Sequence, residues 1–311
     1  MSKRPIFIVT HSRSCSTAFE RIFMTRRDIL TFFHEPFGDA FYFGPEKISP
    51  AHRRWPTDKI ERSGRGHYTY DWVLRSILDA DEDPTKRVFI KDMSYHIVPP
   101  IHSITARAPS LEARNLANSR PNPTLLPAQV VDAFQFVFLI RDPAAAIPSL
   151  YRCFIPPLSA KTEDTSLDPT ELGYRELRIL LDHLREKNQD APPLVIDADD
   201  LLADPDAVLR PLCAYLDISY SPSMLSWPTT EDHKFAFSLF EKYAGYHDDA
   251  LNSTGLVPKV KKEDVMPCSS EEKNDEWEAK YGKEGMQVIR SAVNACRDDY
   301  DYLRSFRMRP S

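Results

Sequence analysis

The sequence lacks the features of several large classes of protein. It has no run of about 18 apolar residues, which a membrane-spanning helix needs. Its net charge of -6 argues against a nucleic-acid partner, because such proteins usually carry a basic surplus. Its five cysteines form no Cys-x-x-Cys pair, which favours reduced thiols and no zinc site. We therefore expect a cytoplasmic protein with no metal, no membrane span and no nucleic-acid partner.

Glycine is also scarce, with 9 glycines against 26 prolines. The prolines cluster between the apolar segments, which indicates loops stiffened by proline. The length of 311 residues and the hydrophobic content of 42% are enough for one large α/β domain. We expect a single domain over residues 1–311, with a core at about 5–217 and a mostly helical C-terminal part at 225–311.

The beginning of the chain has the pattern of a strand, a turn and a helix. Residues 5–10 are an apolar run typical of a buried strand. Phe19, Ile22 and Phe23 then follow at helical spacing. The turn between them, residues 11–17, contains an arginine and several hydroxyl side chains. Since backbone N–H groups at a helix N-terminus bind anions, we expect a phosphate or sulfate group here.

An ATP- or GTP-binding Walker loop is the alternative for this turn. That loop requires Gly-x-x-x-x-Gly-Lys-Ser/Thr, whereas this turn contains neither a glycine nor a Gly-Lys pair. Arg13 also precedes the hydroxyl cluster, while the Walker lysine stands directly ahead of a Ser or Thr. A nucleotide kinase or NTPase is therefore disfavoured, although it remains an alternative.

A second strand-like segment also ends in an arginine. Residues 134–140 are apolar and lead into Arg141, followed by Pro143, which suits the first turn of a helix. Ser149 stands eight residues after Arg141, two turns into that helix. Because ligands of open parallel sheets bind beyond the carboxyl ends of the strands, we expect Arg141 to face the same crevice as Arg13.

The whole chain alternates between strand and helix patterns. Such alternation predicts an α/β fold, in which a parallel β-sheet is flanked by helices on both faces as a three-layer architecture. A loop that contains residues 32–37 is expected after the first helix, and residues 41–68 are expected to be irregular. The expected strands are 5–10, 87–91, 134–140 and 194–197, and the expected helices are 16–28, 70–78, 143–153, 170–187, 206–216 and 271–303.

These segments resemble the motifs of sulfotransferases that use 3′-phosphoadenosine 5′-phosphosulfate (PAPS). Residues 12–17 resemble the family's 5′-phosphosulfate loop, and Arg141 with Ser149 resembles its 3′-phosphate motif. Residues 194–205 resemble a later strand and acidic turn, so the likeness spans residues 5 to about 217. The resemblance implies PAPS as cofactor and adenosine 3′,5′-bisphosphate as product. The cofactor-binding residues that it implies are Arg13, Ser14, Cys15, Ser16, Thr17, Arg141 and Ser149.

The sequence departs from the family pattern at three places. Cys15 replaces the usual glycine, and its Cβ makes a positive φ costly. Ser12 replaces the proline that usually opens the loop. The basic, glycine-containing loop near the C-terminus has no clear counterpart, since Lys259, Lys261 and Lys262 have only Gly255 nearby. A sulfotransferase-like protein that binds nucleotide without turnover is therefore a second alternative.

Sulfuryl transfer requires a base to take the proton of the acceptor hydroxyl. In many cytosolic sulfotransferases the base is a histidine two residues after a lysine. Lys91 matches that lysine, but Met93 stands at the histidine position. Another branch of the family uses a glutamate followed by proline, which matches Glu35. We therefore expect a small-molecule hydroxyl acceptor and Glu35 as base, with Lys91 and Arg13 as further catalytic residues. His34 and His96 are alternative bases.

Overall fold

The structure is a computed structural model that describes residues 4–50, 57–99, 107–112, 122–243, 245–258 and 270–309. Contacts between α-carbons divide the chain into two units. The single domain expected over residues 1–311 stays a prediction. The first unit consists of Met1–His11, Arg26–Phe138 and Glu176–Pro193, and the second consists of Ser12–Thr25, Leu139–Arg175 and Leu194–Ser311.

The strands form a five-stranded sheet in the order β2-β3-β1-β4-β5. Strands β1 and β2 both pair with β3 in parallel, and Ile8 and His34 stand on either side of Lys91. All five residues of β1 are buried, as the continuous apolar run predicts. The expected fold class, an α/β fold with a parallel sheet flanked by helices, is confirmed. The strands are β1 (Ile6–Thr10), β2 (Leu30–His34), β3 (Arg87–Met93), β4 (Gln135–Ile140) and β5 (Leu194–Asp197).

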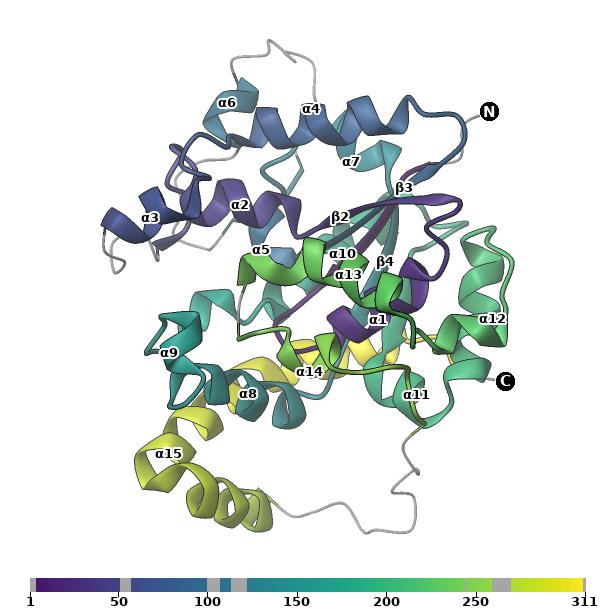
Figure 1. Cartoon of the computed structure of the whole chain (residues 1–311). Helices are drawn as coiled ribbons and strands as arrows, with labels where there is room; N and C mark the ends of the chain where they lie inside the picture. Colours follow the sequence, from purple (N-terminus) through teal and green to yellow (C-terminus); the bar gives the residue numbers. More distant parts are fainter. Residues whose placement is uncertain are drawn as a thin grey trace. The chain divides into compact units, whose positions relative to one another are not determined.

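The helices of the first unit cover strand β3 and the aromatic residues beside it. Helices α2 and α4 run alongside each other and both contact β3 (Figure 1). The ring of Phe7 packs against Phe37, Phe134 and Phe136, which forms the centre of this unit's core. The helices are α2 (Pro36–Phe43), α3 (Thr57–Ser63), α4 (Tyr70–Asp81), α5 (Ser94–Ile97), α6 (Pro109–Glu112), α7 (Ala128–Ala133) and all but the first two residues of α10 (Tyr174–Lys187).

The second unit is mostly helical. Its longest helix, α15, packs along α8 (Figure 1). Gly285 permits this approach, because a Cβ there would lie 3.1 Å from the ring of Tyr151. Among the residues that the structure describes, no helix is long and apolar enough to cross a membrane. The helices are α1 (Ser16–Met24), α8 (Pro143–Tyr151), α9 (Ser159–Thr162), α11 (Ala198–Ala203), α12 (Pro205–Tyr215), α13 (Thr230–Phe240), α14 (Asp248–Leu251) and α15 (Ser270–Ser305).

Several local predictions differ from the structure. Residues 36–43 and 57–63 form helices α2 and α3, where a loop and irregular structure are expected. Residues 30–34 form strand β2 where a loop is expected, because these residues find a parallel partner in β3. Helix α1 ends at Met24, four residues earlier than expected, since the chain needs residues 25–29 to reach β2. The acidic segment after β5 is helix α11, whose N-terminus is capped by Asp197 through the N–H of Asp199.

Candidate functional site

The loop before α1 adopts an uncommon backbone conformation. Arg13 and Cys15 have φ values of 61° and 66°, in the left-handed region. A residue with a Cβ pays about 1–2 kcal/mol for this conformation, and such strain clusters at functional sites. Cys15 thus takes the geometry of the glycine that it replaces. Its side chain gives α1 no cap hydrogen bond.

The side chain of Arg13 lies against Ser149 within the second unit. Its Nε donates a hydrogen bond to Ser149 Oγ at 3.0 Å, and its Nη1 donates to the carbonyl oxygen of Tyr246. Arg141 Nη1 in turn donates to the backbone carbonyl of Arg13 at 3.1 Å. The structure therefore brings together residues predicted from two separate motifs. It places the Arg13 side chain beside the residue expected at the 3′-phosphate, and it places Arg141 against the loop's backbone.

The start of α8 is fixed by hydrogen bonds on both sides of Arg141. Asp142 Oδ1 accepts from the N–H of Ala144 at 2.7 Å and from Arg297 Nη2 at 2.8 Å. Burial raises the pKa of Asp142, but these two hydrogen bonds outweigh burial and hold the pKa below its ordinary value. The hydroxyl of Tyr174 donates to the carbonyl of Arg141 at 2.9 Å. Arg141 and Ser149 therefore stand on a rigid strand-to-helix junction.

A segment near the C-terminus also contacts the loop and α1. His247 Nδ1 lies 3.0 Å from Thr17 Oγ1, and the two atoms share a hydrogen bond. Arg21 Nη1 donates to the carbonyl oxygens of Ala250 at 2.7 Å and Ser253 at 3.1 Å. Burial lowers the pKa of Arg21 to about 10. These bonds hold residues 247–253 against α1.

The sequence alone does not predict the contacts of this C-terminal segment. Tyr246 is 233 residues away from Arg13, and no local spacing rule joins two such positions. Gly245 is a signal in this segment, because its φ of 85° favours glycine. A side chain added at this position would bring its Cβ within 3.0 Å of Thr162 Cγ2. The lysines at 259, 261 and 262, considered for the 3′-phosphate, lie outside the described residues.

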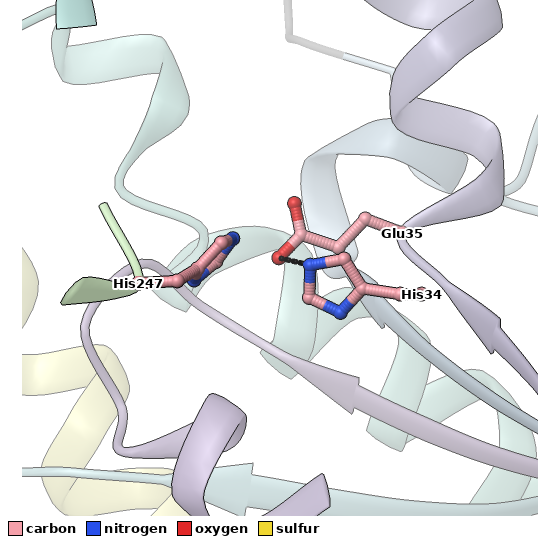
Figure 2. Close-up of side chains that lie close together, drawn as sticks. All are labelled: His34, Glu35 and His247. Carbon is pink, nitrogen blue, oxygen red and sulfur yellow. Dashed lines mark ion pairs between the residues drawn. The ribbon is translucent and has the colours of Figure 1, made fainter. Parts of the chain in front are cut away.

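Glu35 and Lys91 form a buried ion pair in the first unit. Lys91 Nζ donates to Glu35 Oε1, and the two residues are 0% and 4% exposed. The N–H of Glu35 also donates to the carbonyl of Lys91 at 2.7 Å, which extends the pairing of β2 with β3. Figure 2 shows His34 beside Glu35, with His34 Nε2 3.7 Å from Glu35 Oε1. A carboxylate and two basic groups are thus concentrated at the end of two neighbouring strands.

The backbone at Glu35 is left-handed, like the backbone at Arg13 and Cys15 in the loop before α1. Its φ of 45° and ψ of 51° are left-handed, and Pro36 then begins α2 with the fixed φ that suits a first helical turn. A glutamate in this conformation occurs where surrounding contacts force it, here the two bonds to Lys91. Strain of this kind favours a functional role for Glu35 over an ordinary turn residue.

His96, an alternative base, belongs to a second buried pair of the first unit. Its Nδ1 lies 2.6 Å from Asp92 Oδ1, and both residues are fully buried. Asp92 Oδ2 also accepts from the N–H of Phe37 at 2.8 Å. Asp92 therefore connects His96 to the first turn of α2, two residues beyond Glu35. His96 also contacts the rings of Phe41 and Tyr95.

The predicted site residues divide between the two units. The residues predicted to bind the cofactor, including Arg13, belong to the second unit, together with the newly found His247. Glu35 and Lys91 belong to the first unit. The residues in the second unit are cationic and hydroxyl side chains around the start of α1. The residues in the first unit are a carboxylate and the ammonium group that pairs with it.

The sequence profile of the sulfotransferase family matches residues 5–222, more than half of the chain. The chain therefore belongs to the sulfotransferase family, which is a family of transferases. The matched region contains β1 to β5 and every residue predicted for the site.

Individual relatives are more distant. The chain is 34% identical over 147 residues to branched-chain-amino-acid aminotransferase-like protein 1 of Arabidopsis thaliana, which is 46% of the chain and 23% of that relative. It is 26% identical over 266 residues to sulfotransferase ppzF of Metarhizium rileyi, with 75% of the chain and 73% of that relative covered. The match thus spans less than a quarter of the Arabidopsis protein. The sulfotransferase domain from the Synechococcus PCC 7002 olefin synthase is 13% identical, with 94% of each chain covered and a TM-score of 0.43.

Proposed function

We propose that this chain transfers a sulfuryl group from PAPS to the hydroxyl of a small molecule, with Glu35 as general base. One observation carries the donor half of this proposal. Arg13, Arg141 and Ser149 come from separate motifs, yet hydrogen bonds join them beside the start of α1. Guanidinium groups, hydroxyls and a helix N-terminus are the groups that bind phosphate and sulfate.

The chain's own contacts support an oxyanion at this position. One carboxylate oxygen of Asp249 accepts hydrogen bonds from Arg13 and Arg152, so these two guanidinium groups already lie around an anion. PAPS, when bound, supplies the sulfuryl group and a phosphate leaving group. The loop's N–H groups and hydroxyls would hold its phosphosulfate end and so orient it. The residues proposed to hold PAPS are Arg13, Ser14, Cys15, Ser16, Thr17, Arg141 and Ser149.

Glu35 is suited to take the proton of the acceptor hydroxyl. A base must be ionised to accept a proton, and contact with the Lys91 ammonium stabilises the ionised carboxylate. The bonds to Lys91 also fix the orientation of the carboxylate, which general-base catalysis requires. His34 Nε2 lies 3.7 Å from the same oxygen of Glu35, so a second basic group stands near the proposed base.

Two measurements test the proposed function. The first is a thermal shift with adenosine 3′,5′-bisphosphate compared with ATP and Mg²⁺. A ligand at about a hundred times its dissociation constant stabilises a protein by about 2.7 kcal/mol, which such a scan detects. The second is transfer of ³⁵S from labelled PAPS to a panel of alcohols and phenols, with release of adenosine 3′,5′-bisphosphate followed in parallel.

The outcomes separate the proposal from its alternatives. Selective stabilisation by the bisphosphate together with labelled product supports a PAPS-dependent sulfotransferase. Stabilisation by the bisphosphate without transfer to any acceptor favours a nucleotide-binding protein without turnover. Stabilisation by ATP and Mg²⁺ alone would favour a kinase or NTPase and would overturn the assignment of the donor.

A further inference from the structure

The end of strand β3 binds the chain on both sides of the left-handed backbone at Glu35. The N–H of Glu35 donates to the carbonyl oxygen of Lys91 at 2.7 Å. The next residue, Pro36, has no N–H, so the first amide after Glu35 is that of Phe37. This amide donates to Asp92 Oδ2 at 2.8 Å. Two adjacent residues of β3 therefore hold the end of β2 and the first turn of α2.

The carboxylate of Asp92 is itself held in one orientation. Its Oδ1 accepts from the N–H of Met93 at 2.8 Å and lies 2.6 Å from Nδ1 of His96. Since a carboxylate only accepts hydrogen bonds, the proton of this contact is on Nδ1. Asp92 and His96 are both 0% exposed. These bonds fix the plane of the carboxylate, with Oδ2 directed to the N–H of Phe37.

His96 is held by the neighbouring helix α4. The hydroxyl of Tyr70 donates to the carbonyl oxygen of His96 at 2.6 Å. The ring of Tyr70 also stacks on the ring of Phe37, with centroids 5.6 Å apart. Together with Asp92, these residues form a closed ring of contacts that joins α2, α4, α5 and β3 within the first unit. The start of α2 is thus bound to a fully buried polar pair.

The other ring nitrogen of His96 argues against a role in stability alone. Nε2 is buried and has no hydrogen-bond partner among the residues that the structure describes. A buried polar atom without a partner lowers the stability, so an apolar side chain would suit a purely packed position better. Violations of this kind are expected where a residue serves the function of the protein. The bond from Nδ1 to Asp92 is the contact that His96 can contribute to such a function.

We propose that Asp92 and His96 are positioning residues, which hold the Glu35 carboxylate against Lys91 in the orientation that proton transfer requires. The inference rests on the proposed role of Glu35 as base, and it adds two residues that act through the backbone of α2. A reacting group displaced by about 1 Å can lose about 10²-fold in rate. Without the bond to Asp92, the first turn of α2 loses the contact that follows Glu35, and the strained backbone there is free to relax.

Urea unfolding tests the inference without donor, acceptor or turnover. The free energy of unfolding is measured for the parent, Glu35→Gln, His96→Leu and the double variant. Changes at independent sites lower the stability additively. If His96 helps to hold the carboxylate against Lys91, His96→Leu already loosens that ion pair. Glu35→Gln should then cost less stability in the His96→Leu background than in the parent, and equal costs would overturn the inference.

Asp92→Asn enters the same cycle where His96→Leu does not fold. Asparagine has one acceptor oxygen where Asp92 uses two, so it loses the bond to Phe37 or the bond to Met93. Glu35→Gln should again cost less stability in this background. Val73→Ala is the matched control, because it removes buried apolar atoms of α4 in the same unit and no polar contact. Its cost and that of Glu35→Gln should add, and a departure as large as that of His96→Leu would overturn the inference.

Rescue at position 96 tests the same inference in the reaction. The amide nitrogen of asparagine is bonded to Cγ, like Nδ1 of histidine, so His96→Asn keeps a donor for Asp92 and His96→Leu removes it. Turnover per folded protein should fall about ten- to a hundredfold in His96→Leu. It should recover most of this loss in His96→Asn, and the KM for labelled PAPS should stay unchanged in both. A His96→Asn enzyme as slow as His96→Leu would overturn the inference and favour His96 itself as the base.

The outcomes separate this inference from the proposed function. A Glu35→Gln enzyme with the parent's turnover contradicts Glu35 as base, and the positioning role in the reaction falls with it. A slow Glu35→Gln enzyme beside a His96→Leu enzyme as fast as the parent leaves the base in place and contradicts the inference alone. If the parent transfers label to no acceptor, the proposed function fails, while the unfolding cycle still decides whether His96 and Asp92 hold Glu35 in place.

Discussion

Arg13 Nε donates a hydrogen bond to Ser149 Oγ at 3.0 Å, across 136 residues of sequence. This bond joins the loop before α1 to the last turn of α8, so a ligand held by one motif is also in reach of the other. The family resemblance predicts that the two motifs bind different groups of the donor, with Arg13 at the phosphosulfate and Ser149 at the 3′-phosphate. The contact instead predicts that Arg13 serves nucleotide binding directly.

The first prediction follows from that contact. Arg13→Ala should weaken the binding of adenosine 3′,5′-bisphosphate by roughly ten- to a hundredfold, because it removes charge-assisted hydrogen bonds. Arg141→Ala should also weaken binding, since the loop loses the bond that holds its backbone at residue 13. Calorimetry measures both effects. If both variants bound the bisphosphate as tightly as the parent, the proposed donor site would be wrong.

The second prediction concerns the base. Glu35→Gln keeps the shape of the side chain but cannot accept a proton, so turnover should fall by about 10²–10⁴-fold. His34→Gln should reduce turnover less, because the carboxylate remains. Steady-state transfer of ³⁵S measures both variants. A Glu35→Gln enzyme with the parent's turnover, beside an inactive His96→Gln enzyme, would move the base to His96.

Stability measurements are needed to interpret the Glu35 variant. Removing one member of a buried ion pair typically costs about 3–5 kcal/mol, because the other charge is left buried without a partner. Lys91→Met alone should therefore lower the free energy of unfolding strongly. Combining Lys91→Met with Glu35→Gln should recover much of that loss while turnover stays low. Urea unfolding of the two single variants and the double variant separates lost catalysis from lost folding.

The third prediction concerns Cys15, which has a left-handed backbone without being glycine. Cys15→Gly removes the Cβ that opposes this conformation, whereas Cys15→Ala keeps it. The glycine variant should therefore be more stable than the alanine variant by up to about 1 kcal/mol, after the greater chain entropy of unfolded glycine is subtracted. Thermal unfolding of both variants measures the difference. An alanine variant as stable as the glycine variant would show that the loop stores no strain at this position.

Most of the fold could be predicted because its strands are continuous apolar runs. Residues 194–197 match β5, and the run at 134–140 contains β4. Strand β2 was missed because the preceding helix was expected to run to residue 28, nearly up to the strand, whereas α1 ends at Met24. Its place depends on pairing with β3, which is a long-range contact.

The site was predictable only where its residues form local motifs. The loop at 12–17 and the pair Arg141 and Ser149 have recognisable spacings. The contacts of Arg13 with Tyr246 and Asp249, and of Thr17 with His247, join positions more than two hundred residues apart. No periodicity or spacing rule reaches over that distance, so these partners needed the folded chain.

The last prediction is a pH dependence at the start of α8. The pKa of Asp142 lies below its ordinary value, which is about 3.9 in an unfolded chain. The ionised carboxylate therefore stabilises the fold at pH values above about 4, and this stabilisation is lost as the pH falls through the lowered pKa. Asp142→Asn keeps a side-chain oxygen for the N–H of Ala144 but loses the charge that faces Arg297. This variant should be less stable than the parent at pH 7.

The difference between Asp142→Asn and the parent should then shrink as the pH falls below about 4, because the unfolded chain takes up the proton there before the folded carboxylate does. Urea unfolding at a series of pH values from 7 to 3 measures it. Asp142→Ala is the matched control, because it also loses the helix cap, which is worth about 0.5–2 kcal/mol at any pH. Its deficit should therefore persist at pH 3. A deficit of Asp142→Asn that stayed constant from pH 7 to pH 3 would mean that the charge pair with Arg297 does not stabilise the junction that carries Arg141.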